Sequence, residues 1–271
     1  MTREEKLQAI LAKKEYDARD LVTIVELLRL PGGCPWDREQ THQSLRRDMI
    51  EETYEVVEAI DADDPVLLRE ELGDALLQIV LHARIEEEAG RATFDEIAGD
   101  VCRKMIHRHP HVFGDVKAES VGEVLANWED IKSAEKSRKT LTDKLTSIPR
   151  QFPALMRAAK VGKKAKALDF PDAASVAEKL REELAEAEAA IAAGDEKAVF
   201  EEMGDLLLSA ASLARFAGVD PEHALSAATD KFIARFALVE EFAIEEGADL
   251  VSMSDVHKHI LWQKAKKIAK R

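Results

Sequence analysis

The stretches Glu51-Glu52-Thr53-Tyr54-Glu55 and Glu70-Glu71-Leu72-Gly73-Asp74 return later in the chain as Glu182-Glu183-Leu184-Ala185-Glu186 and Glu201-Glu202-Met203-Gly204-Asp205. Each matched acid lies 131 residues after its counterpart, as positions 52 and 183 or 74 and 205 show. The repeat unit is about half of the 271-residue chain. It therefore predicts a duplicated domain and not a solenoid of short repeats.

Within the first copy, the acids are spaced to meet across a helical hairpin. Glu52 and Glu55 are three residues apart and share a helix face, as do Glu71 and Asp74. The two pairs are symmetric about Asp63, which falls in a predicted turn. An antiparallel hairpin would place Glu52 opposite Asp74 and Glu55 opposite Glu71, with all four acids at one level.

The second copy repeats this arrangement around Gly194, with Glu183, Glu186, Glu202 and Asp205 as its four acids. The residues flanking these acids are apolar, whereas a solvated acidic stripe lies opposite the apolar face of a helix. Four carboxylates at one partly buried place repel one another unless protons or a cation neutralise them. Ligand sets made only of oxygen suit Mg²⁺, with Mn²⁺ as an alternative, so both copies are predicted to bind a divalent metal.

Gly73 and Gly204 occupy the same position in the two copies, inside predicted helices. Glycine in a helix costs about 1 kcal/mol relative to alanine. Its recurrence suggests that a helix or a ligand approaches closely there.

A di-iron helix bundle is the main alternative metal site. Such a site uses a Glu-x-x-His motif on paired helices. The one such pattern in the chain, Glu39 to His42, has no second copy. This argues against iron.

The rest of the chain predicts an all-α protein, because Gly and Pro total only 20 and no segment shows sustained strand alternation. Residues 32–37 are a predicted loop, and the polar residues 137–153 are a predicted linker between domains 1–136 and 154–271. The predicted helices cover residues 3–30, 44–60, 66–88, 94–109, 121–135, 173–193, 197–217, 221–245 and 256–269.

The net charge of −14 argues against binding to nucleic acid backbones or anionic membranes. The longest apolar stretches are too short to span a bilayer, and the N-terminus has no signal-peptide core. Two cysteines, Cys34 and Cys102, do not make a disulfide framework. These features predict a cytoplasmic protein.

Both halves also offer basic and aromatic residues for a phosphorylated ligand. Pairs four residues apart recur as Lys104–Arg108, Trp128–Lys132, Lys231–Arg235 and Trp262–Lys266. Lysines and arginines could hold phosphates, and a tryptophan could stack on a base. Singly, such pairs are typical of solvated faces and core tryptophans; the recurrence leaves both interpretations open. Lys179 precedes Glu183 by four residues, whereas the first copy has Asp48 there, which favours the second copy as the catalyst.

Further segments complete a familiar pattern: residues 33–37 (Gly-Cys-Pro-Trp-Asp), residues 108–113 (Arg-His-Pro-His-Val-Phe) and residues 148–150 (Ile-Pro-Arg). Together with the paired acids, they make the chain resemble the MazG family of nucleoside triphosphate pyrophosphohydrolases along nearly its whole length. The resemblance implies an all-α fold of tandem helical domains that form helix bundles, usually in a homodimer. It also implies Mg²⁺-dependent hydrolysis of many nucleoside triphosphates to the monophosphate and diphosphate, in nucleotide housecleaning and the starvation response.

The resemblance implies that the C-terminal copy is the main catalytic unit. Its implied metal ligands are Glu183, Glu186, Glu202 and Asp205, with Glu52, Glu55, Glu71 and Asp74 as their first-copy equivalents. Its implied nucleotide contacts are Lys179, Glu183, Glu201, Asp205, Lys231, Arg235, Trp262 and Lys266. The weaker candidates in the first copy are Lys104, Arg108, Trp128 and Lys132. A lysine that the family carries four residues before Glu202 is Ala198 here.

In the expected mechanism, a metal-activated water attacks the α-phosphorus and Glu202 or Glu201 accepts its proton. Two other functions stay open from the sequence. One is a more specialised pyrophosphohydrolase of the same superfamily, of the dUTPase-like or phosphoribosyl-ATP type. The other is a non-catalytic helical interaction module.

Overall fold

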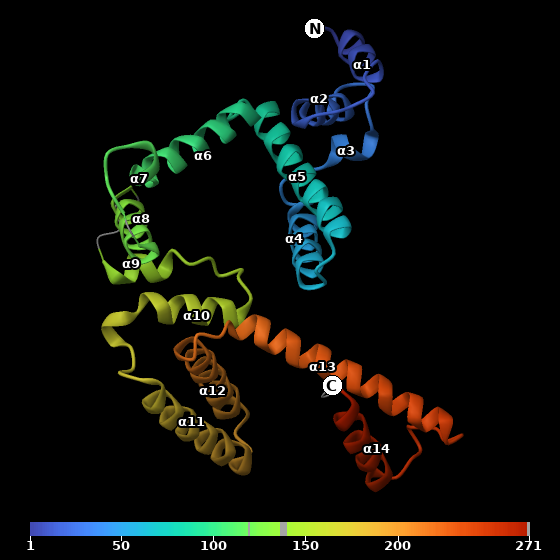
Figure 1. The fold of residues 1–271 in the computed structure, drawn as a ribbon, viewed down its shortest axis with the longest axis vertical. Coiled ribbons are helices and arrows are strands. Elements are labelled where there is room, and N and C mark those ends of the chain that lie inside the picture. Colours follow the sequence, from blue (N-terminus) through green and yellow to red (C-terminus); the bar gives the residue numbers. More distant parts are fainter. Residues whose placement is uncertain (119, 136–139, 270–271) are drawn as a thin grey trace. The chain divides into compact units, whose positions relative to one another are not determined.

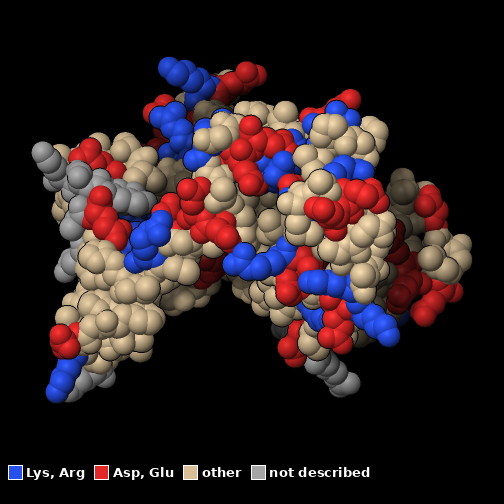
Figure 2. Space-filling model, turned by 90° about the horizontal axis from the view of Figure 1, so that it is seen from above, with Lys and Arg blue, Asp and Glu red and all other residues tan. Residues whose placement is uncertain are grey.

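The computed structural model describes residues 1–118, 120–135 and 140–269. The chain divides into two compact units, Met1–Glu135 and residues 136–271. Every regular element of the described residues is a helix, as the sequence predicts (Figure 1). No helix of this part of the chain has the length and apolar character to cross a membrane. Acidic and basic side chains are interspersed among the other residues on the face shown in Figure 2.

The first unit contains eight of the helices found in the described residues. They are α1 (Arg3–Leu11), α2 (Ala18–Arg29), α3 (Pro35–Glu39), α4 (Arg46–Asp61), α5 (Pro65–Glu88), α6 (Phe94–Arg108), α7 (Pro110–Phe113) and α8 (Val121–Glu135). The second unit continues with α9 (Leu141–Thr146), α10 (Ala154–Lys164), the short 3₁₀ helix η1 (Lys166–Leu168), α11 (Ala173–Ala193), α12 (Glu196–Phe216), α13 (Pro221–Glu245) and α14 (Asp255–Ile268).

Each unit is built around one antiparallel helical hairpin, α4–α5 in the first and α11–α12 in the second. The turns have the predicted centres, since Asp63 and Gly194 both adopt the left-handed conformation, with φ of 51° and 69°. The next residue then caps the following helix. Asp64 Oδ1 accepts from the first backbone amides of α5, and Asp195 Oδ1 accepts from those of α12. Local chemistry thus gives both copies the same turn.

The hydrophobic cores lie beside the hairpins. In the first unit, α2 packs on the second half of α5, where Val25, Leu45, Val80 and Leu81 are buried together. In the second unit, α10 packs on α12 and α13. A further cluster joins α13 to α14 and consists of Val239, Phe242, Ala243, Leu261 and Ala265. The turn-proximal halves of the hairpins, which carry the acids, are outside both clusters.

The prediction of one helix over residues 3–30 is wrong. α1 ends at Leu11, and α2 begins only after Asp17. Asp17 and Asp20 form a capping box in which each carboxylate accepts from a backbone amide of the other residue. This reciprocal cap favours the start of a new helix after Asp17, and the helical stretch is therefore interrupted between α1 and α2.

Three α-helices of six residues or fewer lie where loops or no structure were predicted, and α10 is a fourth helix that was not predicted. α3 begins inside the predicted loop 32–37, with Pro35 at its first position, and α7 begins at Pro110. α9 lies inside the predicted linker 137–153, where Thr140 caps it and α10 contacts it. Residues 136–139 are outside the described residues, so the domain boundaries 1–136 and 154–271 stay a proposal.

Candidate active site

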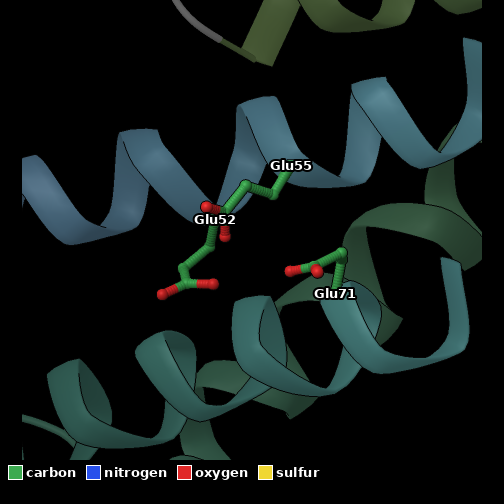
Figure 3. A group of neighbouring side chains, drawn as sticks. All are labelled: Glu52, Glu55 and Glu71. Atoms are coloured by element: carbon green, nitrogen blue, oxygen red, sulfur yellow. The ribbon is translucent and has the colours of Figure 1, made fainter. Parts of the chain in front are cut away.

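Three carboxylates of the first copy converge between α4 and α5. Glu52 and Glu55 project from α4, and Glu71 projects toward them from α5 (Figure 3). One oxygen from each carboxylate lies within 4.8 Å of the other two, a spacing at which the three could hold a metal ion.

The second copy places three carboxylates in the same way on α11 and α12. They belong to Glu183, Glu186 and Glu202, and their oxygens again lie within 4.8 Å of one another. Each of the three is the 131-residue counterpart of a member of the first group. Glu183 is only 5% exposed, so its charge needs a nearby cation.

The fourth acid of each copy lies outside these groups. Asp74 and Asp205 are exposed, and neither is among the three converging carboxylates of its copy. Asp74 does come close enough to Glu52 to raise the pKa of that residue by repulsion. An aspartate is one methylene shorter than a glutamate, so its carboxylate reaches less far from the helix. The three glutamates of each copy meet the spacing for one shared ion, and the role of Asp74 and Asp205 as further ligands stays a prediction.

The carboxylates of the first group repel one another. Burial raises the pKa of Glu52, and repulsion from Asp74, Glu55 and Glu51 adds to the shift, while a hydrogen bond from Gln78 opposes it. Burial likewise raises the pKa of Glu71, with repulsion from Glu55 as the next cause. A hard divalent cation bound by these oxygens would remove the cost of that repulsion.

The second group has a built-in cation. Lys179 Nζ lies 2.8 Å from a carboxylate oxygen of Glu183 and 2.8 Å from one of Glu182. These hydrogen bonds raise the pKa of Lys179. Burial raises the pKa of Glu186, and the charge of Lys179 opposes that shift. Asp48, the first-copy counterpart of Lys179, adds no such cation, so the two copies differ in charge at this point.

Two buried polar residues behind the acids were not predicted from the sequence. Gln78 on α5 and Ser209 on α12 are 6% and 8% exposed, and they are 131 residues apart. Gln78 lies close enough to Glu52 to lower the pKa of that carboxyl, and its own Oε1 has no hydrogen-bond partner among the described residues. The signal in the sequence is a polar residue inside each apolar run, at the same position of both copies.

The predicted nucleotide contacts of the second copy lie on α13 and α14. In Figure 1 these two helices form an arm separate from the α11–α12 hairpin, joined to it at the turn after α12. Lys231 is exposed, and Arg235 is half-buried with an Nε that has no hydrogen-bond partner among the described residues. Trp262 packs against Phe232, with ring centroids 5.2 Å apart. The half-buried Lys266 follows one turn later. Within this chain, these four residues and the carboxylates are on different arms.

The equivalent residues of the first copy contact one another and a neighbouring carboxylate. Arg108 is 5% exposed and forms an ion pair with Glu135. The Arg108 guanidinium and the Lys132 ammonium lie 5.3 and 4.3 Å from the centroid of the Trp128 ring. Lys104 contributes to the lowered pKa of Glu135, of which the hydrogen bond from Arg108 is the largest cause. A carboxylate thus already occupies the position that a phosphate would take beside Arg108.

His42, the histidine of the di-iron alternative, belongs to a different network. Its Nδ1 lies 2.7 Å from Nδ1 of His82, and its Nε2 lies 2.7 Å from Glu86. Arg91 binds the same carboxylate through two nitrogens. Among the described residues, the groups of three ligands contain glutamates and no histidine. The structure therefore gives no support to the iron alternative.

Gly73 and Gly204 face open space. A Cβ added at either position would meet no atom of the described chain within 4 Å. Within the described part of the chain no helix approaches them, so close approach by a ligand stays a prediction.

Known proteins match this chain over both units. The model of the MazG nucleotide pyrophosphohydrolase domain matches residues 40–113 and 171–239, which include both carboxylate groups. A nucleoside triphosphate pyrophosphohydrolase/pyrophosphatase MazG of Thermotoga maritima is 43% identical over 91% of this chain and 94% of its own length. A nucleoside triphosphate pyrophosphohydrolase of Escherichia coli is 42% identical over 91% of this chain and 96% of its own.

A third relative, the uncharacterised protein YabN of Bacillus subtilis, is 46% identical over 92% of this chain. This chain spans about half of that protein, 51% of its length. By the family model, the relatives and the duplicated carboxylates, the chain belongs to the MazG nucleotide pyrophosphohydrolase family.

Proposed function

We propose that this protein is a Mg²⁺-dependent nucleoside triphosphate pyrophosphohydrolase that converts nucleoside triphosphates and water to nucleoside monophosphates and diphosphate. The observation that carries the proposal is the pair of carboxylate groups, which recur residue for residue in both copies. The names of the relatives in Thermotoga maritima and Escherichia coli support the same reaction. A broad base range and a role in nucleotide housecleaning under stress belong to the proposal, as does Mn²⁺ as an alternative metal.

The carboxylates would hold the metal, and Glu183, Glu186 and Glu202 would be its ligands in the second copy, with Asp205 at the edge. Bound there, Mg²⁺ would supply charge for the triphosphate and an acidified water. Glu202 or the exposed Glu201 would accept the proton of the attacking water as the bond to diphosphate breaks. Lys179 would lose Glu183 to the metal, keep Glu182 as a partner and have donors left for a phosphate oxygen.

We assign the main activity to the second copy. Its cation beside the carboxylates, Lys179, has no equivalent in the first copy. Arg235 has no acidic partner among the described residues, whereas Glu135 neutralises its counterpart Arg108. The residue that corresponds to Glu135, by the spacing from the two tryptophans, is Ala269. The first copy is therefore the weaker nucleotide site.

The active form would be a homodimer. A lone hairpin buries one face, and the α11–α12 hairpin exposes apolar side chains on another: Leu184, Ile191, Phe200, Met203, Leu207 and Leu208. Such a patch is typical of an interface. A second copy placed there would complete a helix bundle, cover Gly204 and bring further helices to the carboxylates. Both cysteines are unpaired, which fits the reducing cytoplasm where we propose that the protein acts.

The duplication provides a matched test of this assignment. We expect Glu202→Gln to lower turnover of ATP by at least about a hundredfold, because it removes a metal ligand and a candidate base. Glu71→Gln makes the same chemical change in the first copy, and we expect it to lower turnover less than about threefold. The measurement is the steady-state rate of diphosphate release with excess Mg²⁺. Equal losses in both variants, or full activity in the Glu202 variant, would refute the assignment.

A further inference from the structure

The segment around α10 has a charge opposite to that of the whole chain. From residue 144 to residue 168 there are seven basic residues and no acidic one, in a chain of net charge −14. The seven are Lys144, Arg150, Arg157, Lys160, Lys163, Lys164 and Lys166. This basic segment separates the two duplicated hairpins and is not used by the proposed reaction.

α10 places part of this charge on one exposed face. Its other face packs on α12 and α13. Arg157, Lys160 and Lys163 are exposed and follow at intervals of three residues, so they line one side of the helix. Basic side chains on one exposed helix face are also common where water alone contacts them.

A cavity beside α10 is the second, independent observation. Its volume is about 280 Å³, and Lys160 and Lys163 lie on its wall. The remaining lining is largely apolar or comes from the turn between α12 and α13: Met156, Ala159, Arg215, Gly218, Val219, Asp220 and Pro221. None of the proposed metal ligands lines it. The cavity therefore combines an apolar wall with two cations at a place apart from the carboxylates.

Two of the charged side chains in this lining, Lys160 and Lys163, have no oppositely charged partner among the described residues. Arg215 is neutralised by Asp169, which it binds through two nitrogens at 2.6 and 2.9 Å. Asp220, the one acid of the lining, caps α13 by accepting from the backbone amide of His223, and its single negative charge is outnumbered by Lys160 and Lys163. Among the described residues, neither Lys160 nor Lys163 forms an ion pair, and Lys160 has only the ring of Phe152, 5.5 Å from its centroid. Two unneutralised ammonium groups beside an apolar wall suit an anion with an apolar body.

We propose that this cavity is a second ligand site, which binds a small phosphate-bearing molecule through Lys160 and Lys163. The phosphate would bridge the two ammonium groups, and the apolar wall would contact the rest of the molecule. A long polyanion is disfavoured, because the chain is acidic on both sides of the basic segment and a polyanion would extend beyond the cavity.

The test measures binding without metal, so that the carboxylates do not take part and its result is independent of catalysis. Diphosphate and AMP are titrated into the whole 271-residue chain in EDTA, by calorimetry at physiological ionic strength. The variant Lys160→Gln/Lys163→Gln removes the two lining cations. The control Arg150→Gln/Lys166→Gln removes the same charge from the same basic segment, at exposed positions outside the cavity. Thermal unfolding checks that both variants are folded.

We expect the cavity variant to bind at least one of the probes about tenfold more weakly than wild type, and the control less than about twofold more weakly. A loss for both probes would identify the phosphate as the recognised group, and a loss for AMP alone would identify a nucleotide. Equal losses in the two variants would mean that only the general charge of the segment matters. That result, or no binding of either probe to wild-type protein at millimolar concentration, would overturn the proposal.

Discussion

Glu183 is the most buried acid of either carboxylate group, and its partner Lys179 stabilises its charge in the absence of a metal. A divalent ion held by this site would compete with the lysine for the same carboxylate. Binding would therefore couple two events, the arrival of the metal and the release of a cation for the substrate. The first copy has no lysine at this place, and repulsion from neighbouring carboxylates helps raise the pKa values of Glu52 and Glu71.

At the same scale, the sequence allowed the acids to be predicted but not their partners. The six converging glutamates were predictable because a duplication repeats them with fixed spacing. The contact between His42 and His82 joins residues 40 apart and has no second copy, so no periodicity reveals it. Glu135 was missed for the same reason, since its counterpart in the other half is an alanine.

The histidine contact predicts a pH dependence of stability. Burial lowers the pKa of His82, and the charge of His42 adds to the effect. The unfolded chain takes up a proton near pH 6.5 that the folded chain resists, so stability is lost as the pH falls below about 6.5. The ion pair with Arg91 helps lower the pKa of Glu86 to about 2, so the contribution of that carboxylate is lost only below about pH 4.5.

His82→Leu should reduce the loss of stability between pH 7.5 and 5.5, because it removes the group that resists protonation. Leucine already stands at the equivalent position 213 of the second copy, so the change is compatible with this type of helix packing. The measurement is the free energy of unfolding in urea at the two pH values. A variant with the same pH dependence as wild type would contradict the role given to His82.

At the scale of elements, the hairpins follow from local signals. Each has a left-handed residue at its centre, an aspartate cap after it and apolar faces on both helices. α10 was not predicted, because it is only 11 residues long and follows Pro153 without a side-chain cap. The position of α13 and α14 on an arm separate from the acids depends on tertiary packing, which the spacing of residues in the sequence does not reveal.

The two turns predict different changes in stability when their central residues are exchanged. Gly194→Ala should lower the free energy of unfolding by about 1 kcal/mol, because alanine at a positive φ is strained. A Cβ there meets no atom within 4 Å, so the cost is that of the backbone alone. Asp63→Gly relieves similar strain but increases the freedom of the unfolded chain, so it should change stability by less than about 0.5 kcal/mol. Denaturant unfolding of both variants is the check, and a neutral Gly194→Ala would contradict this view of the turn.

At the scale of the whole molecule, the hairpins leave apolar surface that one chain does not cover. Phe200 is 85% exposed on α12, two residues before Glu202 in the sequence. If a second copy covers it, Phe200→Asp should convert a dimer into a monomer of 30.1 kDa. Val251, also 85% exposed but in the loop before α14, is the matched control, and Val251→Asp should stay dimeric. Light scattering after size exclusion measures both masses; a wild-type monomer, or a dimer that survives Phe200→Asp, would contradict the interface.

The proposed reaction is tested most directly by its products. Purified protein is incubated with ATP and Mg²⁺, with and without EDTA, and the nucleotides and phosphates are separated and quantified. The carboxylate groups and the family predict AMP and diphosphate in equal amounts, and no product when EDTA removes the metal. ADP and phosphate, or no turnover across a panel of nucleoside triphosphates, would contradict pyrophosphohydrolase activity and leave the duplicated carboxylates to bind some other ligand.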